Sequence, residues 1–449
     1  MMGMDSQSRC THIPPEEVRF EATSGLDNTG EVFHWNGGIY RGIRPSHSAF
    51  YSEILSGPIV EQLMASGLVA TEIADCTLDG YGLVLKHKKI PVVSYASEWC
   101  TAMFKDAALL MSRFQEVLLP IGYTLKDGHP WNVLFDGAVP KFVDFGSIVP
   151  YEPRVASFFL REFRATFLYP LLLRSAGLGP YADSALVAHT ILGAYDSPSK
   201  AVIYRALRSN IPARLWLIHR YRDYQIRRLW ERNPSEALRQ LQHQVRAIRE
   251  EPRGEGVYQP KRGPPDRRAA ALTETLEKLR PRSVIFIGIR DHEDALTAEA
   301  QGARVLVADV DDARLNKLYR YVAAHQLNIL PVRMDITGPN LVHGGWGLCS
   351  AAEERFKCEL VVLGSVIERL VRKRRISFAE LTRYLSAFSK KWAIVRFDDQ
   401  PWPGMEYWET LHRTKYNIES FKAHLRRQFS EVLLLEESED SRGLLLCVR

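Results

Sequence analysis

The second half of the chain alternates short apolar runs with stretches of helical periodicity. The apolar runs cover residues 283–287, 304–308, 327–332, 359–364 and 392–397. Strands that are apolar throughout are buried on both faces, as in a parallel sheet covered by helices. This rhythm predicts an α/β fold with a Rossmann-like parallel sheet.

Two further apolar runs near the end of the sequence differ from these five, because no helical stretch separates them. EVLLLEE (431–437) and LLLCVR (444–449) are joined only by the polar turn SEDSRG. This spacing predicts a terminal hairpin that adds an antiparallel strand to the sheet. A parallel sheet that ends in such a hairpin resembles the class I S-adenosylmethionine (SAM) methyltransferase fold.

Three residues at predicted strand ends match this resemblance. Gly288 follows the first strand, and Asp309 lies 309 − 288 = 21 residues later. In Rossmann-like sites an acidic residue about 20 residues after the first βα turn binds a ribose. The resemblance implies that Asp309 binds the ribose of SAM and that Asp335, after the third strand, lies near the adenine. Gly288, Asp309 and Asp335 are therefore the candidate cofactor-binding residues.

The first loop departs from the methyltransferase pattern. Relatives carry an acidic residue followed by several glycines, which let the backbone approach the cofactor closely. Here the loop reads FIGIRDHED, so that Phe286 replaces the acid, while Arg290 and His292 occupy later glycine positions. Glu368 and Arg369 stand where relatives have two histidines. We expect that SAM binds weakly or differently, or that catalysis is lost, and the sequence identifies no catalytic residue.

A stretch of the first half, LKDGHPWNVLFDGAVPKFVDFGS (125–147), has the spacing of a kinase active site. Asp127 precedes Asn132 by five positions, and Asp144 follows Asn132 by 144 − 132 = 12. In kinases the first Asp accepts the proton of the attacking hydroxyl, while the Asn and the second Asp hold Mg²⁺ on the phosphates. A helix predicted at 103–123 leads into this loop. We expect an α+β reduced kinase-like domain.

Other parts of a kinase are missing upstream of this stretch. The sequence has no GxGxxG loop and no VAIK-like strand there, although HWNGGIYRGIRP (34–45) offers three glycines. Arg41 or Arg44 would have to replace the phosphate-binding Lys, with Glu53 or Glu61 as its partner. An arginine is a poor substitute for a compact ammonium group at such a site. A phosphotransferase that uses ATP and Mg²⁺ is therefore the weaker interpretation.

The chain divides at a segment rich in Pro, Gly and Arg, EEPRGEGVYQPKRGPPDRR (250–268). Such a segment buries little apolar surface and is typical of a linker or a long loop. We predict three parts: a reduced kinase-like domain at 1–200, a helical, basic connecting region with its linker at 201–268, and a class I methyltransferase-like domain at 269–449.

This layout resembles one group of bacterial SAM-dependent methyltransferases with an N-terminal kinase-like lobe, the NoeA-type nodulation proteins. The matching pieces span nearly the whole chain and lie at residues 83–99, 125–135, 140–148, 329–339 and 359–370. The resemblance implies a SAM-dependent methyltransferase whose kinase-like lobe helps to bind the substrate. A small-molecule phosphotransferase, and a non-catalytic scaffold or regulator built from two decayed enzyme domains, remain alternatives.

Composition limits the partners and the compartment. A net charge of +6 over 449 residues is too small and too spread out to indicate nucleic-acid binding. No apolar stretch is long enough to span a membrane, and the N-terminus lacks a signal-peptide core. Six cysteines without a CxxC pair predict free thiols in a reducing cytoplasm and no metal site. We expect a small-molecule, glycan or lipid-linked acceptor, and the sequence leaves the oligomeric state open.

Overall fold

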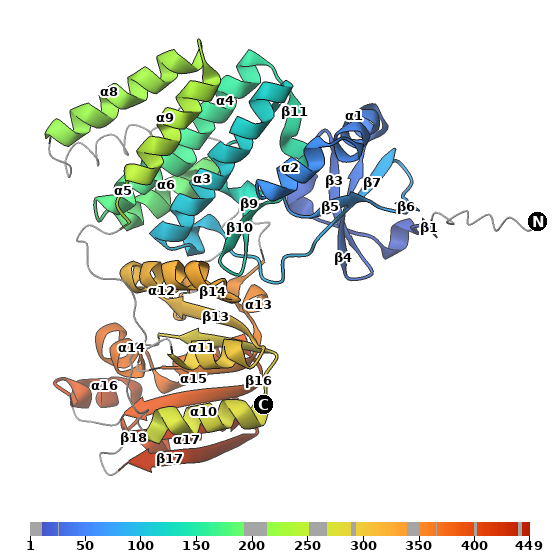
Figure 1. Cartoon of the computed structure of the whole chain (residues 1–449). Helices are drawn as coiled ribbons and strands as arrows, with labels where there is room; N and C mark the ends of the chain where they lie inside the picture. The colour runs from blue at the N-terminus through green and yellow to red at the C-terminus, as the bar shows by residue number, and fades with distance from the viewer. Residues whose placement is uncertain are drawn as a thin grey trace, which may run out of the picture.

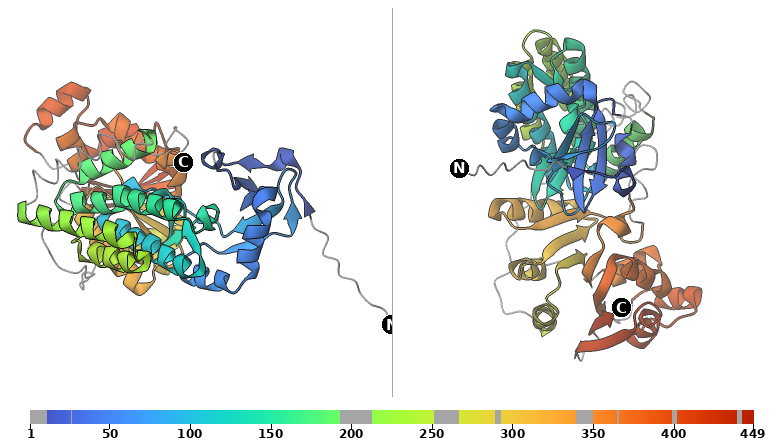
Figure 2. Two further views of the ribbon diagram at one scale, coloured as in Figure 1. Left: turned by 90° about the horizontal axis from the view of Figure 1, so that it is seen from above. Right: turned by 90° about the vertical axis from the view of Figure 1, so that its right-hand side faces the viewer.

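The computed structural model describes most of the chain. Its described residues are 11–25, 27–192, 213–250, 267–288, 293–338, 350–364, 366–398, 402–438 and 442–449. The N-terminal half comprises an antiparallel sheet beside a helical part, and the C-terminal half is a second sheet covered by helices (Figure 1). Seen from above, the N-terminal sheet stands to one side of the rest of the molecule (Figure 2, left).

The N-terminal sheet has five antiparallel strands in the order β2-β3-β4-β7-β5. These are β2 (Arg19–Phe20), β3 (Gly30–Trp35), β4 (Gly38–Ile43), β7 (Leu83–His87) and β5 (Thr71–Ile73). A separate two-stranded pair is formed by β1 (Thr11–His12) and β6 (Cys76–Thr77). The helices α1 (Pro45–Ser56) and α2 (Ile59–Ala65) follow β4.

Residues Asn36 and Gly37 form the tight turn between β3 and β4. Their φ angles are 47° and 72°, the left-handed values that a two-residue hairpin turn requires. An Asn-Gly pair tolerates these angles better than other residues do. Two of the glycine-rich positions noticed in the sequence thus belong to a hairpin, since Gly38 is the first residue of β4.

The helical part of the N-terminal half is built around α3 (Thr101–Leu118), which α9 (Pro234–Ala247) packs against. The other helices are α4 (Pro153–Phe163), which continues through a π-helical turn, α5 (Tyr169–Ser175), α6 (Gly179–Leu192) and α8 (Ala213–Trp230). Between α3 and α4 lie the hairpin β9 (Val133–Asp136) and β10 (Val139–Phe142), and the antiparallel pair β8 (Tyr123–Leu125) and β11 (Ile148–Pro150). Residues 123–150, which include the stretch with the kinase spacing, therefore form two short antiparallel strand pairs that follow the C-terminal end of α3.

The C-terminal sheet has seven strands in the order β14-β13-β12-β15-β16-β18-β17. The parallel strands are β14 (Ile329–Arg333), β13 (Arg304–Asp309), β12 (Ser283–Ile287), β15 (Cys358–Leu363) and β16 (Ser389–Asp398). The hairpin of β17 (Glu431–Ser438) and β18 (Arg442–Val448) is antiparallel, with β18 inserted beside β16. The predicted parallel sheet with a terminal hairpin is confirmed.

Helices cover both faces of this sheet (Figure 2). The helices α10 (Arg267–Leu279) and α11 (Glu293–Ala300) pack together, as do α15 (Phe378–Phe388) and α17 (Ile418–Leu425). The remaining helices are α12 (Asp312–His325), α13 (Ala352–Arg355), α14 (Ile367–Arg374) and α16 (Met405–His412). This arrangement explains why strands β12 and β15 are apolar on both faces.

The two halves are joined through the N-terminus of α3. The backbone N–H of Thr101 donates to Asp312 at 3.0 Å, and that of Ala102 donates to Asn316 at 2.9 Å. These contacts satisfy backbone donors at the first turn of α3, which have no partner within the helix. Buried side chains of both halves belong to one continuous hydrophobic core. The sheet of the C-terminal half is therefore fixed relative to α3.

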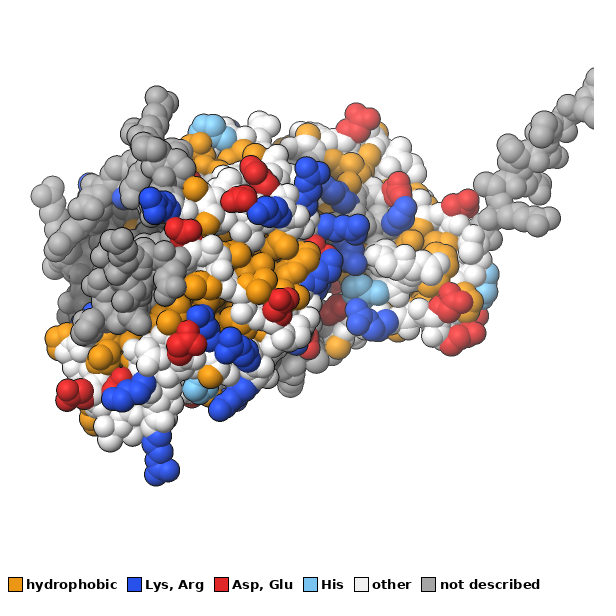
Figure 3. Space-filling view, turned by 90° about the horizontal axis from the view of Figure 1, so that it is seen from below, with side chains coloured by type: hydrophobic (Ala, Val, Ile, Leu, Met, Phe, Trp, Pro, Cys, Tyr) orange, Lys and Arg blue, Asp and Glu red, His pale blue; other side chains and the backbone are white. Residues whose placement is uncertain are grey.

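The described helices and the surface agree with two further sequence predictions. No helix among the described residues is long and apolar enough to cross a membrane. Four cysteines within the described residues are buried, namely Cys76, Cys100, Cys358 and Cys447. One face of the molecule carries Lys and Arg side chains interspersed with acidic and hydrophobic ones (Figure 3).

Candidate functional site

Gly288 terminates the central strand β12 in a conformation that excludes other residues. Its φ angle is +65°, and a Cβ atom there would lie 1.9 Å from Cγ1 of Val366. The Gly288 N–H donates to the carbonyl of Ala308 at 2.8 Å, which ties it to the end of β13. Phe286, at the position where relatives have an acid, is fully buried. Because glycine has no side chain, the backbone after β12 can lie close to Val366, which follows β15.

Asp309 lies at the end of β13 and is almost completely buried, with 3% of its surface exposed. One carboxylate oxygen, Oδ1, accepts hydrogen bonds from the N–H groups of Val310 and Asp311 at 2.7 and 3.1 Å. The other oxygen, Oδ2, is buried without a hydrogen-bond partner among the described residues. Guanidinium nitrogens of Arg314 and Arg369 lie 3.9 Å from the carboxylate, beyond hydrogen-bond distance. A buried carboxylate oxygen of this kind favours a hydroxyl ligand.

Asp335 follows β14 and is already paired. Its Oδ1 accepts from the N–H and the hydroxyl of Thr337 at 3.0 and 2.7 Å. Its Oδ2 forms an ion pair with Arg374 of α14. A ligand that used Asp335 would have to compete with a cationic side chain.

The structure brings Gly288, Asp309 and Asp335 to one edge of the sheet. The Gly288 N–H binds the residue before Asp309, and the Met334 N–H binds the Asp309 carbonyl at 3.0 Å. Ligands of open α/β sheets bind at this carboxyl edge of the strands. Arg290 and His292, together with the side chain of Glu368, lie outside the described residues.

A second cluster of charges surrounds Asp144 in the N-terminal half. Arg41 of β4 is buried, and it donates to Asp144 and to Asp27 at 2.7 Å each. Lys126 donates to the other oxygen of Asp27 at 2.8 Å. Burial disfavours the guanidinium charge, but the two carboxylates hold the pKa of Arg41 above its usual value. Arg41 thus forms an ion pair with Asp144. By its spacing, Asp144 corresponds to the aspartate that binds Mg²⁺ in kinases.

The predicted carboxylate partner of this arginine was wrong. Glu53 and Glu61 are exposed, and the partner of Arg41 besides Asp144 is Asp27, which precedes β3. Arg44 pairs instead with Glu31 at 3.3 Å. The sequence carried no signal for Asp27, because it lies in an irregular loop that only the tertiary fold brings to Arg41.

Asp127 and Asn132 lie in the loop between β8 and β9. Burial, together with the nearby carboxylates of Glu162 and Asp144, raises the pKa of Asp127 to about 6, although His129 opposes this rise. Asn132 is 7% exposed, and its Nδ2 has no hydrogen-bond partner among the described residues. The loop therefore combines kinase spacing with an unusually basic carboxylate.

Sequence reasoning missed Glu162, which lies on α4 and is fully buried. Its Oε2 accepts a hydrogen bond from the Gly128 N–H at 2.6 Å. The signal was an acid inside the apolar run FFLREF (158–163), since a charge in such a run is buried only with partners.

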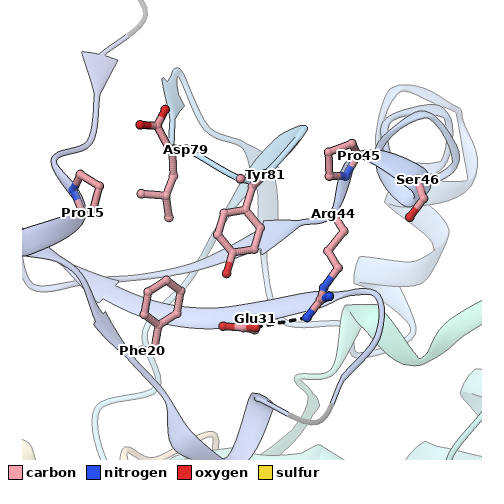
Figure 4. A pocket seen from close by; sticks show the side chains of 10 residues that line it. Pro15, Phe20, Glu31, Arg44, Pro45, Ser46, Asp79 and Tyr81 are labelled. Atoms are coloured by element: carbon pink, nitrogen blue, oxygen red, sulfur yellow. Dashed lines mark hydrogen bonds and ion pairs between the residues drawn. The ribbon is translucent and has the colours of Figure 1, made fainter.

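A cavity of about 630 Å³ opens on the N-terminal sheet (Figure 4). It lies between Phe20, Tyr81 and the ion pair of Glu31 with Arg44, and reaches the start of α1 at Pro45. Of the residues that the sequence suggested for binding, only Arg44 lines it among the described residues, whereas Gly288, Asp309, Asp335, Asp127, Asn132 and Asp144 do not. Burial and Glu31 raise the pKa of Tyr81 to about 12.

Comparisons with known proteins give a relative by sequence and partial matches among solved structures. The nodulation protein NoeA of Rhizobium meliloti (strain 1021) is 25% identical over 438 residues, which cover 88% of each chain. No family model matches the chain. Two solved structures are similar over part of the chain: the bifunctional kinase-methyltransferase WbdD (15% identity, 40% of this chain, 37% of that chain, TM-score 0.30) and the N-methyltransferase NodS of Bradyrhizobium japonicum WM9 (15%, 41%, 94%, 0.30). The matched part thus spans less than half of WbdD. By its sequence, this chain is a homologue of the nodulation protein NoeA.

Proposed function

We propose that the chain is a SAM-dependent methyltransferase whose cofactor site lies at the carboxyl edge of β12, β13 and β14. The observation that carries the proposal is the strand order β14-β13-β12-β15-β16-β18-β17, with β18 antiparallel. This is the order 3-2-1-4-5-7-6, in which class I methyltransferases arrange their strands. Gly288 and Asp309 then occupy the positions that the family uses for its cofactor.

The residues present fit the ribose of SAM. The buried Oδ2 of Asp309 has no hydrogen-bond partner among the described residues, and a ribose hydroxyl would supply the missing donor. Asp335 fits less well, because Arg374 and Thr337 occupy both of its oxygens. The proposed site therefore depends chiefly on Asp309.

When bound, SAM supplies a methyl group on a sulfonium that is already a strong donor. The protein's task is then mainly to hold donor and acceptor in line. In this proposal Asp309 orients the ribose, and Gly288, which has no side chain, allows the cofactor to approach the end of β12 closely. The acceptor remains a small molecule, a glycan or a lipid-linked group, and the described residues supply no catalytic base.

The proposal extends to the division of the chain. Residues 269–449 form the methyltransferase-like domain, residues 1–200 a reduced kinase-like domain, and residues 201–268 a connecting region. In this proposal the N-terminal sheet, α3 and the loop from β8 to β11 make up the kinase-like lobe. Because Arg41 occupies Asp144, we assign this lobe to acceptor binding in the cytoplasm rather than to phosphoryl transfer.

Titration calorimetry with SAM on the full chain tests the proposal. We expect binding that Asp309→Ala weakens at least tenfold, because the ribose loses its carboxylate. Asp311→Ala is the matched control, since Asp311 caps α12 from the same loop and does not offer a free buried oxygen. Absence of SAM binding, or equal binding by Asp309→Ala, would refute the site.

A small-molecule phosphotransferase is the second candidate. The observation in its favour is Asp127, whose pKa of about 6 suits a group that accepts a proton near neutral pH. A thermal shift with ATP and Mg²⁺ that disappears in Asp144→Asn would support this candidate. If neither SAM nor ATP binds, the non-catalytic scaffold is the remaining interpretation.

A further inference from the structure

Three side chains that can bind a metal ion converge beside the kinase-spaced loop. Asp127 follows β8, His129 lies two residues later, and Glu162 comes from α4. One ligand atom from each of the three lies within 4.8 Å of the others. One imidazole nitrogen and two carboxylate oxygens within this distance are the beginnings of a coordination sphere.

The backbone of the loop is built to hold these residues together. The Gly128 N–H donates to Oε2 of Glu162 at 2.6 Å, and the hydroxyl of Thr166 donates to the Gly128 carbonyl at 3.3 Å. A Cβ atom on Gly128 would lie 2.5 Å from the carbonyl oxygen of Phe159, so α4 rests directly on the loop. The glycine thus permits the contact that brings Glu162 beside Asp127 and His129.

The charges around the cluster favour a cation. Asp127 lies near two other carboxylates, Glu162 and Asp144, which both disfavour its ionised form. The ammonium of Lys126 is directed to Asp27 at 2.8 Å, and Arg41 spans Asp27 and Asp144. Lys126 and Arg41 therefore direct their positive charges to Asp27 and Asp144.

The imidazole of His129 supplies a second, independent observation. Its Nδ1 is buried and has no hydrogen-bond partner among the described residues. A buried polar atom without a partner is rare in folded proteins and indicates an ion, a water or a function. Nitrogen ligation by imidazole is the usual solution for zinc, whereas Mg²⁺ prefers oxygen ligands.

We propose that Asp127, His129 and Glu162 bind one Zn²⁺ ion, which fixes the loop after β8 to helix α4. Three protein ligands leave the fourth tetrahedral position to water. The site differs in place and in ligands from a kinase magnesium site, which would use Asn132 and Asp144. A metal-bound Asp127 cannot accept a proton from a substrate hydroxyl, so the proposal excludes the phosphotransferase mechanism.

Zinc binding to the full chain, freed of metal by dialysis against a chelator, tests the proposal. Competition with a chromophoric chelator should give one high-affinity Zn²⁺ per chain. His129→Ala and Asp127→Asn should each weaken binding at least tenfold, because each removes a ligand. Asp136→Asn is the matched control and should leave the affinity unchanged, because Asp136 pairs with Lys88 and is not one of the three converging side chains.

A second measurement keeps the test decisive if a variant is unstable. Co²⁺ substituted into the wild-type chain should give the visible absorption of a tetrahedral site with nitrogen and oxygen ligands, and an excess of Zn²⁺ should displace it. Excess Mg²⁺ should not displace it. Absence of stoichiometric Zn²⁺ binding by the wild-type chain would overturn the proposal, as would binding that His129→Ala retains or that Asp136→Asn abolishes.

Discussion

Arg41 and Asp144 form a buried ion pair of 2.7 Å that links the N-terminal sheet to the kinase-spaced loop. The arginine side chain is 5% exposed, and it also binds Asp27 at 2.7 Å. A Cβ atom on Gly146 would lie 2.3 Å from the Arg41 guanidinium, so the Asp-Phe-Gly turn closes directly over this pair. The spacing in the sequence suggests that Asp144 binds magnesium, whereas in the folded chain Asp144 binds the guanidinium of Arg41.

Removal of Arg41 should destabilise the protein strongly. Arg41→Met leaves the carboxylates of Asp27 and Asp144 without their common cation in a buried site, at an expected cost of about 3–5 kcal/mol in the free energy of unfolding. Arg44→Met is the control, because Arg44 is 46% exposed and should cost less than about 1 kcal/mol. Urea denaturation measures both. Equal losses in the two variants would contradict the central role of Arg41.

His87 should make stability depend on pH. Complete burial, with a contribution from Arg41, lowers the pKa of His87 from 6.5 to about 3. The unfolded chain therefore takes up a proton first, and stability falls as the pH decreases from about 6.5 towards 3. This linkage amounts to about 2 kcal/mol at pH 5.

The variant His87→Gln checks this dependence. Glutamine does not titrate, so the stability of the variant, measured by urea denaturation at several pH values, should fall by about 2 kcal/mol less between pH 7.5 and 5 than that of the wild type. The variant His12→Gln, at an exposed position, provides the control for the substitution itself. A His87→Gln profile that parallels the wild type would show that His87 is not buried in its neutral form.

Gly288 should be replaceable only if Val366 becomes smaller. Gly288→Ala should cost about 2–4 kcal/mol, because alanine is strained at φ +65° and its Cβ collides with Val366. In Gly302→Ala the φ angle is +85° but no atom lies within 4 Å, so only the backbone strain of about 1–2 kcal/mol remains. Val366→Ala should partly rescue Gly288→Ala in a double-mutant cycle of unfolding free energies, and additive effects would contradict the predicted contact.

The contact between the two halves should depend on Glu98 and Arg355. Glu98 is fully buried, and Arg355 donates to both of its oxygens at 2.6 and 2.9 Å. Arg355→Met leaves a buried carboxylate without its cation, at an expected cost of about 3–5 kcal/mol. We expect limited proteolysis to separate the halves of this variant faster than those of the wild type. The surface variant Lys391→Met should be cleaved at the wild-type rate, and identical digestion of all three proteins would argue against the pair.

The sequence alone determined the local structure of the C-terminal half. Its parallel strands contain continuous apolar runs and its turns are polar, so burial of these runs on both faces of a parallel sheet was predictable from residues 283–397. The terminal hairpin was also predictable, because a short polar turn cannot accommodate a crossover helix. The position of β18 between β16 and β17 required the structure, since the sequence does not state which hairpin strand joins the sheet.

Only the tertiary structure decided the partners of the charged residues. The spacing of Asp127, Asn132 and Asp144 was visible in the sequence, but Arg41 lies 144 − 41 = 103 residues from Asp144 and Glu162 lies 162 − 127 = 35 residues from Asp127. Periodicity reports which face of an element is buried, and it carries no information about which distant charge meets which. Ion pairs inside a fold form where packing brings side chains together, and their geometry determines whether a carboxylate is free for a ligand or already neutralised.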